Sequence, residues 1–176
     1  MRANLKLAVT IYALSALAIA PIFMPKSAAA VAPTGMTGHY IGAGISAGVT
    51  NGGQDGDAAT LGGNIQGRYQ ISNAPISLRG AVLFSDETSA IMPMISYDLP
   101  INNNSNLYLG TGYSFVESDG KPTPLGNKDA VVLTAGIETN LTKKIVFYTD
   151  AKLGINAYQD SPASALSFQM GAGYRF

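Results

Sequence analysis

The chain has no cysteine and no tryptophan, and His39 is its single histidine. Without cysteine, no disulfide can stabilise the fold, so backbone pairing and burial must do so. With one imidazole, the chain also offers few candidates for a general base. These absences argue against a small disulfide scaffold and make an enzyme a poor interpretation.

Residues 1–30 have the pattern of a secretory signal. Arg2 and Lys6 precede an almost unbroken apolar run, and small residues follow at 27–30. The run is shorter than the ~20 residues of a membrane-spanning helix, and prolines follow it at once. We therefore predict export, cleavage after the small residues, and one domain over 31–176.

Basic residues are scarce in the predicted domain. Setting aside Arg2, Lys6 and Lys26 leaves eight basic residues against eleven acidic ones. No basic patch remains that could neutralise the phosphates of a nucleic acid. The sequence therefore predicts no nucleic-acid partner.

No segment after residue 30 has the 3.6-residue period of an amphipathic helix, whereas the two-residue period of a β-strand recurs eight times. The last segment is the clearest, because Phe168, Met170 and Tyr174 alternate with polar residues and glycine up to Phe176. The predicted strands cover 39–49, 59–71, 75–85, 88–99, 106–116, 130–141, 145–156 and 166–176. In 88–99, methionines interrupt the polar face and Pro93 cannot donate to a ladder, so we expect a bulge there.

The charges within these strands decide which face is outward. Six of them share the face opposite the apolar one, namely Arg68, Arg79, Glu138, Asp150, Lys152 and Arg175. An apolar face turned to lipid keeps these charges inside, where they avoid the ~2 to 4 kcal/mol cost of Arg or Lys at the bilayer midplane. The strand number is even and each strand can cross a bilayer. The sequence therefore predicts an all-β fold, an eight-stranded antiparallel up-and-down transmembrane β-barrel.

The predicted loops differ in length and charge. Connections after alternate strands are short, and most of the others are long and rich in Gly, Asp, Pro and Asn. Short turns face the periplasm in this architecture, so the long loops would form an outer rim. The predicted rim carries Asp55, Asp57, Asp86, Glu87, Glu117, Asp119, Asp129 and Asp160, opposed by Lys121 and Lys128.

The inward charges are the strongest candidate site. In a ring of eight strands, Arg68 would face Glu138 and Arg79 would face Asp150. An eight-stranded barrel is just wide enough for side chains to fill it, which favours a packed and paired polar core. The alternative is an ion-pair gate in a narrow pore.

Other candidate sites are weaker. The glycines inside the first two strands lack the following helix of a phosphate loop, so we expect them to relieve crowding. They are Gly42, Gly44, Gly48, Gly62 and Gly63. Asp55 and Asp57 offer oxygen ligands for Ca²⁺ or Mg²⁺, but the spacing of a calcium loop is missing, so we predict no metal site. A hydrolase or acyltransferase would need a histidine at the outer rim, and His39 lies at the other end. We predict no catalytic residues and no cofactor.

Three glycine-rich phrases carry a family resemblance: Tyr-Ile-Gly-Ala-Gly at 40–44, Tyr-Leu-Gly-Thr-Gly-Tyr at 108–113 and Gly-Ala-Gly-Tyr-Arg-Phe at 171–176. With the strand pattern, they make the chain resemble the small eight-stranded outer-membrane barrels of the OmpA and OmpX kind, in the porin-like group. The tract 99–113 and the tail are also similar to small outer-membrane proteins of cyanobacteria. The resemblance implies that the barrel-assembly machinery recognises Phe176, together with Tyr174.

These observations predict a monomer in the lipid of the cell outer membrane, with a structural, surface-interaction or marginal-pore role. An unidentified ligand at the acidic outer loops is a further possibility. Two alternatives remain open at this point. One is a porin-like channel for small solutes or ions, and the other is a soluble periplasmic calyx whose apolar faces turn inward around a hydrophobic ligand.

Overall fold

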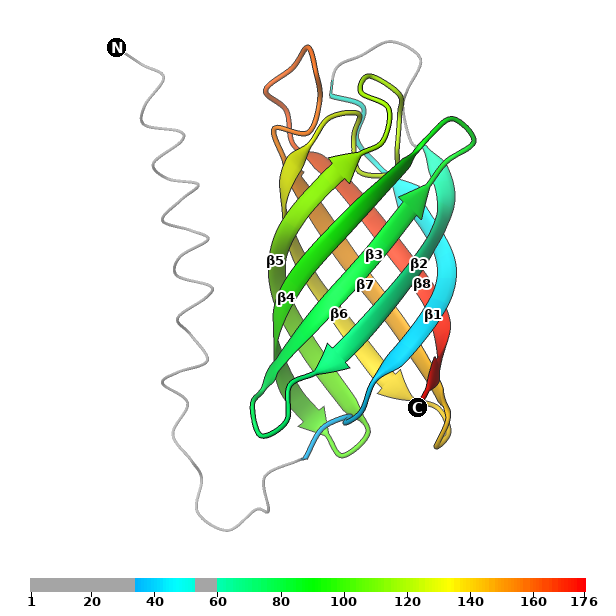
Figure 1. Ribbon diagram of the computed structural model, residues 1–176, viewed down its shortest axis with the longest axis vertical. Helices are drawn as coiled ribbons and strands as arrows, with labels where there is room; N and C mark the ends of the chain where they lie inside the picture. Colours follow the sequence, from blue (N-terminus) through cyan, green and yellow to red (C-terminus); the bar gives the residue numbers. More distant parts are fainter. Residues whose placement is uncertain (1–33, 53–59) are drawn as a thin grey trace, which may run out of the picture. The chain divides into compact units, whose positions relative to one another are not determined.

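The structure is a computed structural model that describes residues 34–52 and 60–176 (Figure 1). The predicted signal, and Asp55 and Asp57 of the predicted outer rim, lie outside the described residues. Among the residues described, no helix is long and apolar enough to cross a membrane.

Eight antiparallel strands follow one another around a closed barrel, and β8 returns to pair with β1. Their bounds are β1 Tyr40–Gly48, β2 Leu61–Gln70, β3 Ile76–Phe84, β4 Ser89–Asn102, β5 Ser105–Val116, β6 Ala130–Asn140, β7 Ile145–Ile155 and β8 Ala165–Arg175. We call the end with the β1–β2, β3–β4, β5–β6 and β7–β8 connections the loop end, which is uppermost in Figure 1, and the opposite end the turn end. The predicted all-β barrel is confirmed.

The structure corrects the sequence prediction in β4. The expected bulge at Pro93 is wrong, because the register between β4 and β5 is the same from Ala90 to Pro100 and Pro93 pairs with Gly80 of β3. The register shifts between Pro100 and Asn102 instead, where β4 runs three residues beyond the predicted end into a tight turn.

The apolar faces of the strands point outward. The large side chains that remain exposed include Ile45, Leu61, Tyr69, Leu78, Ile91, Ile95, Phe115, Val131, Phe168 and Tyr174. Such a surface suits lipid and would promote aggregation in water. A soluble calyx needs the opposite arrangement, so this alternative is wrong.

The barrel interior is divided along its length. Toward the loop end, the buried side chains form an apolar cluster of Ala81, Leu83, Met92, Met94, Leu125, Ala130, Val132, Ala157, Tyr158 and Ala165. Met92 and Met94, which interrupt the polar pattern of the sequence, belong to this cluster. Toward the turn end, most of the buried interior is polar and charged, beside a smaller apolar cluster of Met36, Tyr40, Val146 and Tyr148. We call these regions the apolar half and the polar half.

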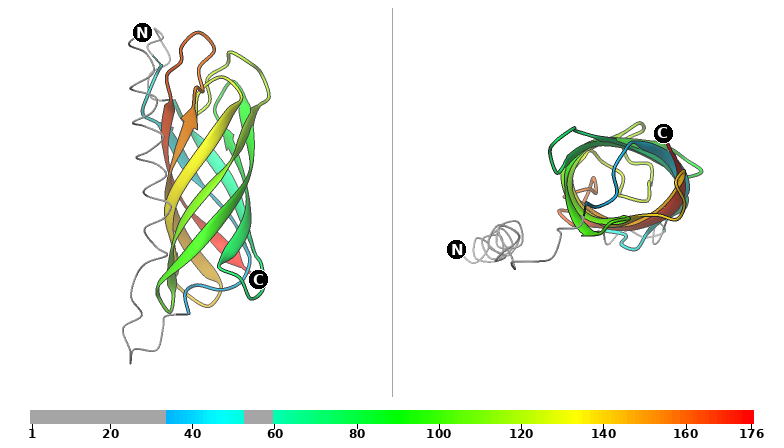
Figure 2. Two further views of the ribbon diagram at one scale, coloured as in Figure 1. Left: turned by 90° about the vertical axis from the view of Figure 1, so that its left-hand side faces the viewer. Right: turned by 90° about the horizontal axis from the view of Figure 1, so that it is seen from below.

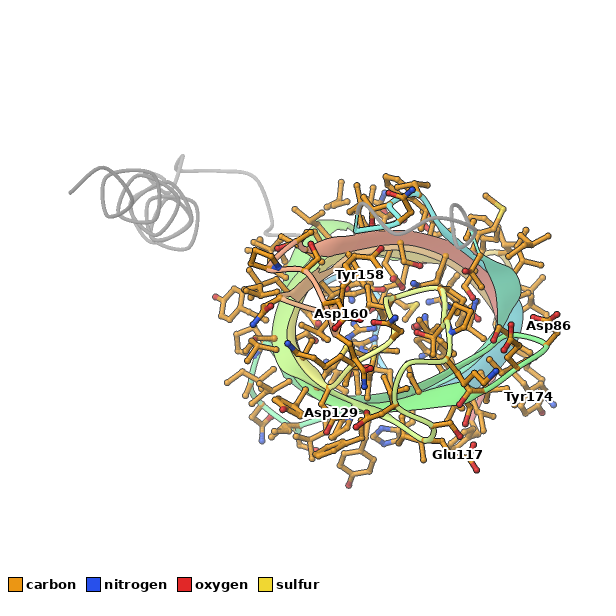
Figure 3. All side chains as sticks on the ribbon, turned by 90° about the horizontal axis from the view of Figure 1, so that it is seen from above. Asp86, Glu117, Asp129, Tyr158, Asp160 and Tyr174 are labelled. Carbon is orange, nitrogen blue, oxygen red and sulfur yellow. The ribbon has the colours of Figure 1, made fainter. Side chains whose placement is uncertain are left out.

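Segments outside the strands cover both openings of the barrel. At the turn end, residues 34–39 cross the opening ahead of β1, visible as the blue segment in the view from below (Figure 2). At the loop end, the β5–β6 connection crosses the opening, and its residues 123–127 are buried (Figure 3).

Candidate functional site

A ring of four buried charges occupies the polar half. Arg68 on β2 and Arg79 on β3 each contact the same two carboxylates, Asp98 on β4 and Glu138 on β6. The Arg68 guanidinium lies 2.7 Å from Asp98 and 2.9 Å from Glu138. The Arg79 guanidinium lies 3.1 Å from Asp98 and 3.0 Å from Glu138. The predicted pair of Arg68 with Glu138 is present.

Strand register and neighbouring hydroxyls hold the ring in place. Arg68 and Arg79 are direct partners in the β2–β3 ladder, so their side chains enter the interior side by side. Arg68 Nε donates to Ser77 Oγ, and Arg79 Nε donates to Ser96 Oγ. Both serine hydroxyls also donate to Asp98. Charges taken out of water are tolerated only when such contacts satisfy them.

A second buried group lies beside the ring. Lys152 Nζ lies 2.5 Å from Asp150 Oδ1, and the Tyr108 hydroxyl donates to Asp150 Oδ2 at 2.7 Å. The Arg79 guanidinium carbon lies 3.6 Å from the centroid of the Tyr108 ring, a cation–π contact that links the two groups. The predicted pair of Arg79 with Asp150 is therefore not formed. Asp150 pairs instead with Lys152, which lies two residues away on the same face of β7.

Arg175 does not join the network. Its side chain donates to Thr37 Oγ1 at 3.3 Å, at the turn end, and its backbone N–H donates to the Lys144 carbonyl. The structure thus brings five of the six predicted interior charges together and leaves Arg175 at the edge.

Glycines make room for the tyrosines of the polar half. A Cβ at Gly136 would lie 2.5 Å from Cζ of Tyr108, and a Cβ at Gly42 would lie 2.8 Å from the ring of Tyr148. Both distances are too short for carbon atoms, so these positions exclude a side chain. The expectation that strand glycines relieve crowding is confirmed at Gly42, and Gly136 has the same role.

Residues 34–39 form a cap over the polar half, the turn-end cap. Met36 is buried, its N–H donates to Asn106 Oδ1, and its carbonyl accepts from Asn106 Nδ2 and Arg68 Nη1. Gly35 has φ +72°, and a Cβ there would overlap Asn106. The cap is therefore bonded directly to the ion-pair ring.

Residues 123–127 form the loop-end plug. Leu125 is 1% exposed and belongs to the apolar cluster. The backbone of Thr123 and Gly126 closes a tight turn through two mutual hydrogen bonds, with Gly126 at φ +98°. Asn127 N–H donates to the Ala157 carbonyl, which ties the plug to the β7–β8 connection. The β5–β6 connection is thus partly interior, although its acidic residues predict a free outer loop.

Tyr158 covers the mouth next to the plug (Figure 3). Its hydroxyl donates to the Thr50 carbonyl at 2.6 Å. Burial raises the pKa of the Tyr158 phenol above its usual range, and the hydrogen bond to the side-chain hydroxyl of Thr50, at 3.0 Å, partly offsets this rise. Between Tyr158 and the plug, a cavity of about 10 Å³ is lined by Thr50, Thr60 and Asn127, among others. This is at the lower limit for holding one water molecule.

The exposed acids gather at the loop end. Asp86, Glu87, Glu117, Asp119 and Asp160 are exposed there, and Asp129 is half-buried. Figure 3 shows Asp86 and Glu117 at the rim and Asp160 over the mouth. Within 34–52 and 60–176, no three His, Asp or Glu side chains form a group that could hold a metal ion.

Sequence comparison identifies the family of this barrel. The model of the outer membrane protein beta-barrel domain matches residues 13–176. The chain belongs to this family. Its location in the outer membrane follows, and the predicted family resemblance is confirmed. No curated protein matches the sequence.

Solved structures share the fold. Ail, the attachment invasion locus protein of Yersinia pestis, is 20% identical with a TM-score of 0.51, over 80% of this chain and 100% of Ail. OprG of Pseudomonas aeruginosa is 10% identical with a TM-score of 0.57, over 82% and 99%. The N-terminal β-barrel domain of Pseudomonas aeruginosa OprF is 14% identical with a TM-score of 0.53, over 81% and 100%. At these identities the similarity establishes the fold alone, and a cyanobacterial source stays a prediction.

Proposed function

We propose that this protein is a closed outer-membrane barrel with a structural and surface-interaction role, and that it neither catalyses a reaction nor conducts under resting conditions. The short turns of such barrels face the periplasm, which makes the loop end extracellular. One observation carries the proposal: the interior is filled by the ion-pair ring and the apolar cluster, with a cap at one end and a plug at the other.

The extracellular surface offers an acidic rim for a partner. The exposed carboxylates favour a cationic surface or a basic segment of another protein. The plug holds the β5–β6 connection across the mouth, so Glu117 and Asp119 are displayed from an ordered base rather than from a free arm. An ordered loop costs less entropy when a partner binds.

The proposal includes a monomeric barrel, since the closed sheet leaves no strand edge to pair with a second copy. The barrel-assembly machinery recognises Phe176 and Tyr174 during insertion. The absence of catalysis is supported by His39, whose Nδ1 accepts from the Gln70 N–H and whose ring stacks on Tyr69 at 4.3 Å, away from any carboxylate pair described above.

A gated pore is the second candidate, and the ring itself favours it. Each arginine contacts both carboxylates, so either one can release a carboxylate and keep the other. Such an exchange could open a polar path through the turn-end half. The plug and the apolar cluster would still block the loop-end half.

Planar-bilayer conductance separates the two candidates. We expect no conductance steps from the wild-type chain, from Glu138→Ala or from Arg68→Ala, because the plug remains in each. Wild-type openings whose frequency changes in Glu138→Ala would establish the gated pore instead. Retention of heat-modifiable gel migration confirms that each variant is folded.

A further inference from the structure

The lipid-facing surface has a groove where β8 pairs with β1. The groove has a volume of about 410 Å³, and the residues that line it include Ile41, Ala43, Ile65, Ile145, Ala172 and Tyr174. The groove is shallow and open toward the lipid, so an occupant lies along the surface of the barrel. Its apolar lining suits a lipid chain.

Short side chains make its floor. Ala43 and Ala172 are direct partners across the β1–β8 seam. The neighbouring outward pairs are bulky: Ile41 with Tyr174 toward the turn end, and Ile45 with Met170 toward the loop end. The floor is therefore recessed between two walls of exposed apolar side chains.

A cation lies at the turn-end wall. Lys144 Nζ lies 5.7 Å from the centroid of the Tyr174 ring, and Tyr174 itself lines the groove. Lys143 is the adjacent residue, and both lysines are exposed. Figure 3 shows Tyr174 on the outer surface of the barrel. The groove thus combines an apolar floor with positive charge at one end.

The charge distribution favours an anionic occupant. Within the described ranges, every exposed carboxylate side chain lies at the loop end, and Asp98, Glu138 and Asp150 are buried inside the barrel. No carboxylate side chain there competes for Lys143 and Lys144. Lysines next to a bilayer surface attract anionic headgroups.

We propose that this groove is a binding site for one anionic phospholipid of the periplasmic leaflet. One acyl chain lies over Ala43 and Ala172, and the phosphate contacts Lys144, with Lys143 beside it. Tyr174 lies between the acyl chain and the phosphate, at the headgroup level where aromatic residues are enriched. The site would hold a single lipid more tightly than the surrounding bilayer does.

Native mass spectrometry of the full chain in detergent micelles tests this site, with phosphatidylglycerol or phosphatidylcholine added. The wild-type barrel should retain one phosphatidylglycerol in preference to phosphatidylcholine. Lys144→Gln should reduce that preference roughly fivefold. Ala172→Phe should abolish retention by filling the floor, and the smaller Ala43→Ile should weaken it.

Matched controls are available on the same chain. Lys121→Gln removes a lysine at the loop end, and Ala135→Phe enlarges an exposed outward alanine on β6. Both should retain the lipid as the wild type does. The proposal is overturned if Ala172→Phe and Ala43→Ile leave retention unchanged, or if Lys144→Gln leaves the preference unchanged. It is also overturned if the groove variants dissociate a two-chain species, since a second copy would then occupy the groove.

Discussion

The two halves of the barrel interior are closed by different physical means. The polar half is held by ion pairs with fixed geometry, in which two arginines share two carboxylates. The apolar half is held by packing, with Leu125 inserted among Leu83, Met92 and Val132. Removing one member of a buried ion pair leaves the other charge unpaired, whereas apolar packing tolerates changes that conserve volume.

The two halves also differ in what covers them. The turn-end cap is bonded to the ring through Met36, Asn106 and Arg68, so cap and ring should respond together. The loop-end plug is attached to loops and contacts the strands mainly through apolar side chains. We therefore expect the plug to open separately, while the cap follows the ring.

Removing a shared carboxylate should have the largest effect. Glu138→Ala would leave both guanidiniums buried with only Asp98 to pair with, so we expect the free energy of unfolding to fall by about 3 to 5 kcal/mol. Urea unfolding in lipid vesicles, followed by gel mobility, measures this. The exposed Glu117→Ala is the control and should change stability by less than about 0.5 kcal/mol. Equal losses in the two variants would contradict the importance of the ring.

The lysine pair should show strong coupling. Lys152→Met leaves Asp150 charged and bonded only to Tyr108, and we expect a loss of about 3 kcal/mol. Combining it with Asp150→Asn removes both charges and should recover much of that loss. The same unfolding assay applied to both single variants and the double variant gives the coupling energy. Additive losses would show that the pair does not act as a unit.

Disturbing the plug should have a smaller and more local effect. Leu125→Ala should lower the free energy of unfolding by about 2 kcal/mol, at the low end for a buried leucine because a loop can partly collapse. In the folded barrel, trypsin should cleave faster after Lys128, which is followed by Asp129. Glu138→Ala should not speed this cleavage while the barrel remains folded. If it does, the two halves are not separate.

The smallest effect should come from a conservative change in the apolar half. Met92→Leu keeps the volume and should cost less than about 1.5 kcal/mol. Ser96→Ala in the polar half removes only a hydroxyl, but this hydroxyl accepts from Arg79 and donates to Asp98. We expect it to cost about 1 to 3 kcal/mol, as for an unsatisfied buried partner. The midpoint temperature of the gel shift should be lower for Ser96→Ala than for Met92→Leu. The reverse order would contradict the proposed difference between the polar and the apolar half.

The fold could be predicted because its signal is repeated eight times. Period-two alternation fixes both the strand and its buried face, and the faces of Arg68, Glu138 and Lys152 follow from it. Asp98 was within reach of the same rule, since it lies between the outward Tyr97 and Leu99. Arg79 pairs with Asp98, together with Glu138, and therefore not with the predicted Asp150.

The cap and the plug could not be predicted in this way. Residues 34–39 and 123–127 have no period, and their burial depends on which opening they reach after the barrel closes. The apolar Pro124 and Leu125 inside an otherwise polar loop were the available signal. The sequence also could not predict which carboxylate each arginine contacts. The strands of a barrel are staggered, so the residues that face each other across it differ from those expected for eight aligned strands.

The most direct test of a filled interior is the reactivity of one thiol placed between the halves. Thr134 faces inward on β6, between Val132 of the apolar cluster and Glu138 of the ring, and is 5% exposed. Because the chain has no cysteine, Thr134→Cys provides a unique thiol. In vesicles, a membrane-impermeant thiol reagent should label Glu117→Cys at the rim and leave Thr134→Cys unlabelled. Labelling of both at similar rates would show a continuous aqueous lumen and contradict the closed barrel.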